Sequence, residues 1–172
     1  MKEIRTRRLL LRPLREEDEN DVIDLLTDEK ITKTYLVPRF ASRAEAVPLF
    51  QKIMAYSRSD DHYIRGMEYE GRIVGFLNDV SLSEAECELG WVVRPDCWGK
   101  GICTEAVSAV LPDLCRMGVR RVIAGAFDTN PASLRVMEKC GMVPIDKTEE
   151  IPYRGETHHC VFRAWEPEKK SN

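Results

Sequence analysis

The sequence predicts a single mixed α/β (α+β) domain over residues 1–172, and three observations carry this prediction. The length of 172 residues suits one domain rather than two. Apolar residues make up 43% of the chain and charged residues 32%, which supplies a hydrophobic core and excludes a disordered or fibrous protein. Helical and strand periodicities follow one another without a repeat, a linker or a low-complexity tract. The ordered core is expected at about residues 3–166, with a frayed tail over 166–172.

The first part of the chain predicts one strand followed by two helices. Residues 4–14 are expected to form a single strand. The acidic block 16–24 overlaps apolar residues at helical spacing, so we expect a helix with a solvated acidic face, the alternative being a surface for a basic peptide. Residues 30–42 have no clean period and predict a loop. Helical spacing returns over 44–56, with Pro48 expected in the first turn.

The middle of the chain changes to strand periodicity. Residues 63–69, 72–80 and 86–93 are short and rich in β-forming residues, and Glu70-Gly71 predicts a tight hairpin between the first two. A helix is then expected over about 102–117, because apolar residues recur there at helical spacing.

The last third predicts a strand, a helix and two more strands. Residues 121–127 form the strand, and the helix begins at Asn130-Pro131 and runs through Cys140 to Gly141. Asparagine suits the N-cap, proline the first helical position and glycine the position after the C-cap. The final strands are expected within 142–151 and 156–165.

Charge and cysteine content narrow the class of protein. The chain has 26 basic and 29 acidic residues, a net charge of −3, which disfavours a nucleic-acid binder that works through phosphate attraction. No apolar run approaches the length of a membrane span, and the N-terminal segment lacks the features of a secretory signal.

Six cysteines without C-x-x-C spacing predict free thiols in a reducing compartment, so we expect a cytoplasmic protein. His158, His159 and Cys160 lack a second ligand pair, so no metal site is expected.

Two glycines form the most informative segment, between the strand over 86–93 and the helix that follows. They lie in the run Trp98-Gly99-Lys100-Gly101-Ile102-Cys103-Thr104-Glu105. Glycine permits backbone conformations closed to other residues, so successive N–H groups can converge on an anion at the positive end of the helix dipole. A pyrophosphate is the natural occupant. The alternative is an ordinary tight turn whose glycines serve geometry alone.

Two familiar phosphate motifs do not fit this turn. A Walker A loop requires G-x-x-x-x-G-K-[ST], whereas Lys100 lies between the two glycines. The dinucleotide fingerprint G-x-G-x-x-G requires glycine where Thr104 stands, and an acid about 20 residues later, where residues 119–121 are Val-Arg-Arg. A variant that binds NADP is therefore a poor third alternative.

At this turn the sequence resembles a known family. Arg94-Pro95-x-x-Trp98-Gly99-Lys100-Gly101-Ile102-x-Thr104-Glu105-Ala106 is similar to the acyl-coenzyme A loop of GNAT-type N-acetyltransferases, most of all in the branch of the ribosomal-protein alanine (Rim-type) acetyltransferases. Three further stretches are similar to that branch in the same order: Thr6-x-Arg8-Leu9-x-Leu11-Arg12-Pro13-Leu14, Glu88-Leu89-Gly90-Trp91 and Asn130-x-x-Ser133-x-x-Val136-x-Glu138-Lys139-x-Gly141. Together they span nearly the whole chain.

The resemblance implies the GNAT acyl-CoA N-acyltransferase fold, with a mixed, mostly antiparallel central sheet flanked by helices. It implies that a primary amine attacks the thioester of acetyl-CoA directly and takes the acetyl group, without a metal. The acceptor is either a protein N-terminal α-amine or a small-molecule amine. Whether the protein is a monomer or a homodimer stays open.

The resemblance also implies which residues hold acetyl-CoA. They are Val92, Val93, Trp98, Gly99, Lys100, Gly101, Cys103, Thr104 and Asn130. Backbone N–H groups of the turn would bind the pyrophosphate, and those of Val92 and Val93 would pair with the pantetheine arm as an added strand does. Lys100 adds charge, or is simply a solvated lysine. Cys103 departs from the alanine or glycine usual in the family.

Glu88 and Ser133 are the reacting groups that the resemblance implies. Glu88 would accept a proton from the amine, because a protonated amine cannot attack a thioester; the alternative is a glutamate paired with an arginine on the strand surface. Ser133 would protonate the departing thiolate, or merely cap the helix, and Asn130 likewise contacts the cofactor or caps. An N-terminal amine, with a pKa of about 7.7–8.0, loses its proton more easily than a lysine at about 10.4, which favours α-amines and small amines of lowered pKa.

A second hypothesis is a non-catalytic sensor or interaction module that binds coenzyme A on the same fold. Cys103 motivates it, as does Met142, which follows Gly141 where many relatives outside this branch have a tyrosine nearby. In that case the substitution Glu88→Gln would change nothing measurable.

The acceptor site is where the sequence says least. In this fold its walls come from residues 27–60 and 145–158, whose pattern is the weakest of the chain. His62, His158 and His159 either line that cleft or are ordinary surface or core histidines.

Overall fold

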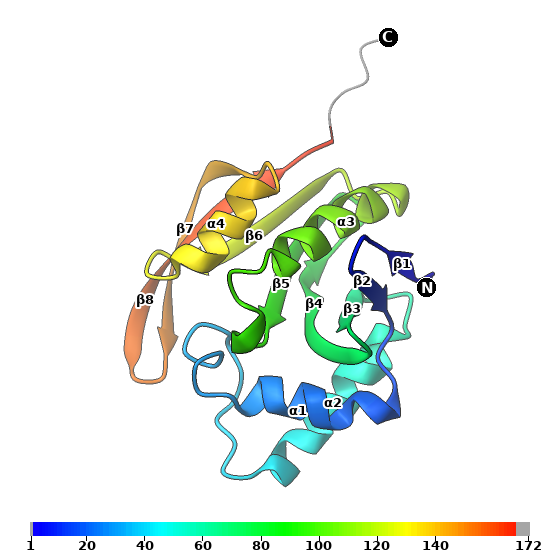
Figure 1. Ribbon diagram of the computed structural model, residues 1–172. Coiled ribbons are helices and arrows are strands. Elements are labelled where there is room, and N and C mark those ends of the chain that lie inside the picture. The colour runs from blue at the N-terminus through cyan, green and yellow to red at the C-terminus, as the bar shows by residue number, and fades with distance from the viewer. Residues whose placement is uncertain (1, 168–172) are drawn as a thin grey trace.

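An eight-stranded sheet lies at the centre of the structure, a computed structural model that describes residues 2–167 (Figure 1). Its strand order is β1-β2-β3-β4-β5-β6-β8-β7, and every neighbouring pair is antiparallel except β5 and β6. The strands are β1 Ile4–Arg5, β2 Leu9–Arg12, β3 Ile64–Tyr69, β4 Arg72–Leu82, β5 Glu86–Val93, β6 Arg121–Phe127, β7 Val143–Tyr153 and β8 Glu156–Trp165. The helices are α1 Glu19–Thr27, α2 Arg43–Ser57, α3 Ile102–Arg116 and α4 Pro131–Lys139. The expected frayed tail lies, from residue 168, outside the described residues.

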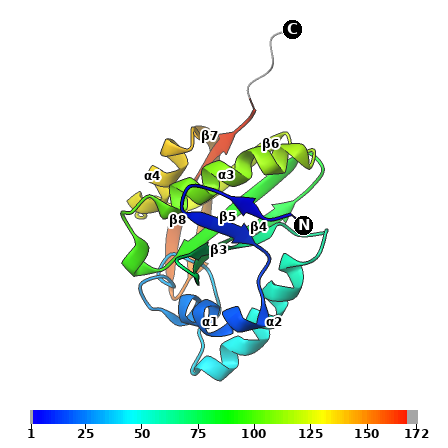
Figure 2. The same cartoon turned by 45° about the vertical axis from the view of Figure 1, so that its right-hand side comes forward.

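Two pairs of helices flank the sheet (Figures 1 and 2). On one face, α3 buries Ala106 and Val110 in a core cluster shared with the strands, and α4 packs beside it. On the other face, α1 and α2 bury Leu25 and Phe50 in a second cluster with residues of β4. This arrangement confirms the predicted α/β class and the mostly antiparallel sheet flanked by helices.

The strand predicted over residues 4–14 is two strands. β1 and β2 pair antiparallel, with Ile4 opposite Leu11. The turn between them is fixed from far along the chain: the carboxylate of Glu105 on α3 accepts hydrogen bonds from the Thr6 hydroxyl at 2.6 Å and from the Arg8 N–H at 2.8 Å. The prediction of one continuous strand was wrong because a tertiary contact, which the local pattern does not contain, bends the chain here.

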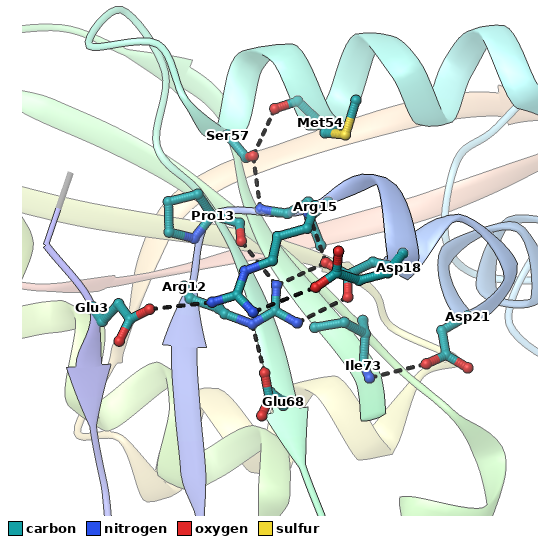
Figure 3. Close-up of polar contacts among 12 residues, drawn as sticks. Glu3, Arg12, Pro13, Arg15, Asp18, Asp21, Met54, Ser57, Glu68 and Ile73 are labelled. Carbon is teal, nitrogen blue, oxygen red and sulfur yellow. Dashed lines mark hydrogen bonds and ion pairs between the residues drawn. The ribbon is translucent and has the colours of Figure 1, made fainter. Parts of the chain in front are cut away.

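Part of the acidic block is buried rather than solvated (Figure 3). The Asp18 side chain is 6% exposed, and its two oxygens accept bonds of 2.7 and 2.9 Å from the guanidinium of Arg12. Arg12 also donates to Glu68 on β3 at 2.6 Å. Asp21 accepts from the backbone N–H of Ile73 at 3.1 Å. The expectation of a wholly solvated acidic face was wrong at these positions because they join α1 to the sheet.

Pro48 lies in the second turn of α2 rather than in the first. The helix begins at Arg43, after an extended Ser42, so Pro48 is its sixth residue. A proline there leaves the carbonyl of Ala44 without its usual N–H partner. The prediction of Pro48 in the first turn was wrong because the helix begins five residues before the proline.

The remaining predicted elements agree with the structure to within two residues. The hairpin between β3 and β4 turns at Glu70 and Gly71, whose φ angles of +52° and +77° are both left-handed, as a tight hairpin requires. At α4 the side chain of Asn130 accepts a bond from the Ser133 N–H, which confirms the predicted N-cap. Local sequence signals therefore predicted the bounds of most helices and strands.

The sheet separates between β5 and β6. Their parallel pairing covers only 86–88 with 121–123, after which β5 runs on to Val93 and β6 to Phe127. A bulge in β4 lies opposite this point, because the register shifts between Asp79 and Ser81. A bulge bends its strand and increases the local twist. The edge of β5 beyond Glu88 consequently has no strand neighbour on that side in the described structure.

All six cysteines are free thiols, as predicted. Four of them, Cys87, Cys97, Cys140 and Cys160, are buried and act as small apolar residues. Within residues 2–167, no helix combines the length and the apolar character needed to cross a membrane.

Removing the carboxylate of Asp18 is expected to destabilise the protein strongly. Asp18→Ala leaves the buried charge of Arg12 without its bidentate partner, and this should lower the free energy of unfolding by about 3–5 kcal/mol, measured by urea denaturation. Glu17→Ala is the control, since the neighbouring Glu17 side chain is 70% exposed; its effect should stay within about 0.5 kcal/mol. Equal effects of the two substitutions would contradict the assignment.

A second buried ion pair joins β3 to α3. Arg65 donates to Asp113 at 2.7 Å, and the hydroxyl of Tyr63 donates to the same oxygen at 2.9 Å. Partial burial alone raises the pKa of Asp113, but the hydrogen bonds from Tyr63 and Arg65 outweigh it and hold the pKa below its ordinary value. The folded state therefore favours the ionised carboxyl.

Asp113→Asn is expected to lower the free energy of unfolding at neutral pH by about 1.5–3 kcal/mol. A carboxyl whose pKa is lowered by folding stabilises the protein above its ordinary pKa of about 3.9, and this contribution is lost as the pH falls through the lowered value. The difference between wild type and variant should therefore shrink in acid. Urea titrations from neutral to acidic pH measure it, and a constant difference would refute the role of the ionised carboxyl.

Candidate active site

The turn between β5 and α3 presents a row of backbone N–H groups. Gly99 and Gly101 adopt left-handed φ angles of +71° and +74°, and α3 begins directly after Gly101. Within the described residues, none of the N–H groups of 99–104 has an acceptor. The first N–H groups of a helix have no partner inside the helix and carry the positive end of its dipole. The turn therefore fits a diphosphate, the occupant expected from the glycines.

Arg8 and Glu105 hold this turn in place. Arg8 donates from Nη1 to the carbonyl of Lys100 at 2.9 Å and from Nε to Glu105 at 2.7 Å. Burial by itself raises the pKa of Glu105, but the hydrogen bonds from Thr6 and Arg8 bring that pKa below its ordinary value. The sequence did not assign this role to the pair. Its only signal was that both residues lie in stretches similar to the Rim-type branch.

A groove of about 480 Å³ runs beside the turn. Of the residues expected to hold acetyl-CoA, those that line it are Val92, Val93, Trp98, Gly99, Gly101, Cys103, Thr104 and Asn130. Lys100 is not among the described residues that line the groove. Basic residues that the sequence did not single out line it instead: Lys30, Lys33, Arg135 and Lys139. The groove thus combines free N–H groups with positive charge.

Two side chains of the groove answer questions that the sequence left open. The indole of Trp98 donates to the carbonyl of Val93 at 2.8 Å, so it fixes the end of β5 against the turn. Burial raises the pKa of the Cys103 thiol, which keeps this side chain uncharged. The departure from alanine or glycine at position 103 therefore adds no negative charge where phosphates would bind.

Asn130 and Ser133, at the start of α4, lie where the groove meets a second cavity, and both residues line both hollows. Asn130 Oδ1 accepts from the Ser133 N–H, and Asn130 Nδ2 donates to Ser133 Oγ, each at 3.2 Å. Because Asn130 supplies the proton in the second bond, the Ser133 hydroxyl keeps its own proton for another acceptor. Capping and contact with a ligand are therefore compatible at this helix end.

The second cavity, of about 380 Å³, lies at the separation of β5 and β6 and contains Glu88. The Glu88 side chain is 19% exposed. Thr34, Tyr35 and Trp91 line this cavity and the groove alike, together with Asn130 and Ser133. The predicted acid-base residue and the predicted cofactor turn are thus placed in adjoining hollows with a common wall.

Glu88 has an ionic partner that the sequence did not suggest. Lys147 on β7 lies with Nζ 3.4 Å from Glu88 Oε2 and 3.3 Å from Glu149 Oε1. Burial lowers the pKa of Lys147, but the carboxylates of Glu88 and Glu149 outweigh it and raise the pKa overall. The ammonium also lies 3.9 Å from the centre of the Phe162 ring. The partner expected for a merely structural Glu88 was an arginine; the structure shows a lysine from a strand with weak pattern.

The loop between α1 and α2 closes over both hollows and is tied to the β7–β8 hairpin. The hydroxyl of Tyr153 lies 2.8 Å from the carbonyl of Thr32 and 3.1 Å from that of Tyr35. The hydroxyl of Tyr35 in turn donates to Asn78 on β4 at 3.0 Å, and burial raises the pKa of Tyr35. Residues 30–42 and Tyr153 lie in the two segments, 27–60 and 145–158, that the resemblance gave as walls of the acceptor site, although nothing periodic in the sequence marked the individual residues.

The three histidines lie elsewhere. His62 bonds Asp79 at 3.0 Å, His159 bonds Glu150, and the ring of His158 stacks on Phe127 at 4.3 Å. None of the three is among the described residues that line either hollow. Of the two alternatives for these residues, the structure supports surface or core histidines.

Comparison with known proteins agrees with this geometry. Residues 8–143 match the family model of the acetyltransferase (GNAT) domain. The chain is 30% identical over 149 residues to the uncharacterised N-acetyltransferase YnaD of Bacillus subtilis, a match that covers 81% of each protein. A GNAT-family acetyltransferase from Bacillus anthracis shares its fold with a TM-score of 0.83 at 26% identity, over 96% of this chain and 98% of that one.

A second solved structure is similar in fold alone. RimL, a ribosomal L7/L12 α-N-protein acetyltransferase solved in complex with coenzyme A, has a TM-score of 0.85 at 17% identity, over 96% of this chain and 98% of that one. Family model, relative and structures all point the same way. The chain belongs to the GNAT family of acetyltransferases, enzymes that transfer the acetyl group of acetyl-CoA to an amine.

Proposed function

We propose that this enzyme binds acetyl-CoA in the 480 Å³ groove and that a primary amine in the 380 Å³ cavity attacks the thioester at their junction. One observation carries the proposal: Glu88 lies in one hollow, the free N–H groups of the glycine turn in the other, and Asn130 and Ser133 line both. The thioester of acetyl-CoA supplies the reactive carbonyl group, and residues of the protein would orient the two substrates and transfer the protons.

The glycine turn would hold the diphosphate of the donor. Six free N–H groups at a helix N-terminus offer hydrogen bonds to phosphate oxygens, and Arg8 adds a fixed positive charge beside them. The open edge of β5 at Val92 and Val93 would pair with the amides of the pantetheine arm. These contacts bring the thioester end of the donor toward Asn130.

Glu88 would take the proton that the amine loses. An amine is a nucleophile only when neutral, and a carboxylate in the cavity can accept its proton directly or through one water. The ammonium of Lys147, 3.4 Å from Glu88 Oε2, partly compensates the charge of this carboxyl. This role needs an amine of moderate pKa, which favours α-amines and small amines over lysine side chains.

Ser133 would complete the reaction. When the C–S bond breaks, the thiolate gains a negative charge, and the Ser133 hydroxyl, whose proton Asn130 leaves free, can donate it to the sulfur and regain a proton from water. The demand is light, since a thiol with a pKa of about 8.5 is a fair leaving group.

We also propose that the chain lies near the Rim-type branch, on the strength of its four matching stretches, and that it works in the cytoplasm, where its six thiols would stay reduced. The acceptor is a protein N-terminal α-amine or a small-molecule amine.

Glu88→Gln is expected to lower the rate of acetyl transfer by about 100-fold, because the amide cannot accept the proton. The measurement is thiol release from acetyl-CoA over a panel of amines. Glu86→Gln is the matched control: Glu86 lies two residues earlier on β5 and pairs with Arg121 at 3.2 Å, away from both hollows. A loss below tenfold for Glu88→Gln, with coenzyme A still bound, would favour the sensor module instead.

Gly101→Ala is expected to weaken the binding of acetyl-CoA by tenfold or more, because alanine is strained at a φ of +74° and turns the N–H groups away. Calorimetric titration with coenzyme A measures it. Gly71→Ala introduces the same strain at a φ of +77° in a remote hairpin, so it should destabilise the fold comparably and leave binding unchanged. Equal affinities for the two variants would count against the role of the turn.

A further inference from the structure

We propose that the acceptor is a compact primary amine that carries one positive charge and no carboxylate, and that Glu149 is the residue that selects it. The inference rests on the proposed function and concerns the 380 Å³ cavity that contains Glu88. Three features of that cavity lead to it: its charge, the position of Lys147, and its mainly apolar walls.

Two carboxylates line the cavity, and the ammonium of Lys147, which is not among the lining residues, lies against both of them. Glu88 from β5 and Glu149 from β7 both line it. Residues that face them from the other elements are neutral: Thr34, Asn78, Asn130 and Ser133 carry no charge, and burial raises the pKa of the Cys160 thiol to about 11. Lys147 balances one of the two carboxylates. One negative charge is left in excess, which attracts a cation and repels a carboxylate.

The ammonium of Lys147 shows what the two carboxylates can hold. It lies 3.4 Å from Glu88 Oε2 and 3.3 Å from Glu149 Oε1, so Lys147 occupies the position between the two and leaves Oε2 of Glu149 for an incoming ammonium. The side chain of Glu149 is 50% exposed and that of Glu88 19%. Glu149 can therefore meet an incoming ammonium at the mouth of the cavity, and Glu88 can take its proton further in.

The walls of the cavity limit the size and polarity of the group to which the acceptor amine is attached. They are mainly apolar: Leu36, Val80, Leu89, Trp91, Ala126, Phe127, Ile151 and Phe162. The loop that carries Leu36 is tied to the β7–β8 hairpin through the Tyr153 hydroxyl, 2.8 Å from the Thr32 carbonyl. A short aliphatic or aromatic amine would match the volume of about 380 Å³ and the apolar lining.

The strand that carries Glu149 provides its own control. Glu149 lies opposite Cys160 and lines the cavity, whereas the next residue, Glu150, lies opposite His159 and bonds its ring nitrogen. Successive residues of a strand face opposite sides. Glu150→Gln therefore removes the same charge one residue away, on the side of the hairpin that faces away from the cavity.

The experiment compares matched pairs of acceptors with the full-length enzyme. Leucinamide and phenylalaninamide are the probes, because an α-amine next to a neutral carbonyl has the lowered pKa of an N-terminus. Leucine and phenylalanine have the same side chains with a carboxylate in place of the amide. An alanine-initiated peptide tests the N-terminal alternative. We expect each amine to exceed its amino acid and the peptide by at least tenfold in kcat/KM. Glu149→Gln should raise KM for the amines by about tenfold, with KM for acetyl-CoA unchanged, whereas Glu150→Gln should change neither.

A second readout separates this inference from the proposed function. Calorimetric binding of leucinamide to protein saturated with coenzyme A needs no turnover. Suppose that the wild-type protein releases no thiol but binds the amine, and that Glu149→Gln weakens this binding about tenfold. The role of Glu149 in selecting the ligand is then supported, and the proposed acetyl transfer is refuted. Preference for the peptide or for the amino acids, or equal behaviour of Glu149→Gln and Glu150→Gln in both measurements, overturns the inference.

Discussion

The short parallel pairing of β5 with β6 is the constraint on which the whole site depends. Three residues of each strand are joined, and beyond Glu88 and Ile123 the two strands no longer pair. The bulge in β4 lies at the same level and bends the sheet there. If the pairing continued, the edge of β5 would be occupied and Glu88 would be covered. The separation creates the open edge, the groove and the 380 Å³ cavity at once.

Elements distant in sequence hold that separation open from both sides. Arg8, in the turn after β1, fastens the glycine turn through Lys100 and Glu105, and Arg12 fastens α1 through Asp18. On the far side, Lys147 and Tyr153 of β7 reach across to Glu88 and to the loop before α2. Buried or bidentate ion pairs of this kind specify position more than they add net stability. Here they set the distance between the two halves of the sheet.

The sequence predicted the elements that depend on local signals. The glycine turn, the Asn130 N-cap and the Glu70-Gly71 hairpin were identified because glycine, asparagine and proline restrict or permit particular backbone angles where they stand. The break between β1 and β2 and the burial of Asp18 were missed, since both depend on partners, Glu105 and Arg12, that no local pattern joins to them. Lys147, Glu149 and Tyr35 lie in segments that the resemblance gave as acceptor walls, but the individual residues were not identified, because their contacts arise only from what the fold brings near them.

The wall shared by the groove and the cavity has a consequence for how the two substrates bind. Thr34, Tyr35 and Trp91 face both hollows, so a molecule in one of them orders side chains that the other molecule must also meet. Once the first substrate has bound and ordered these side chains, the second substrate does not bear that entropy cost. By thermodynamic linkage, each substrate then increases the affinity for the other by the same factor. Such a wall favours a ternary complex that contains donor and acceptor together over a ping-pong mechanism in which the two bind one after the other to a covalently modified enzyme.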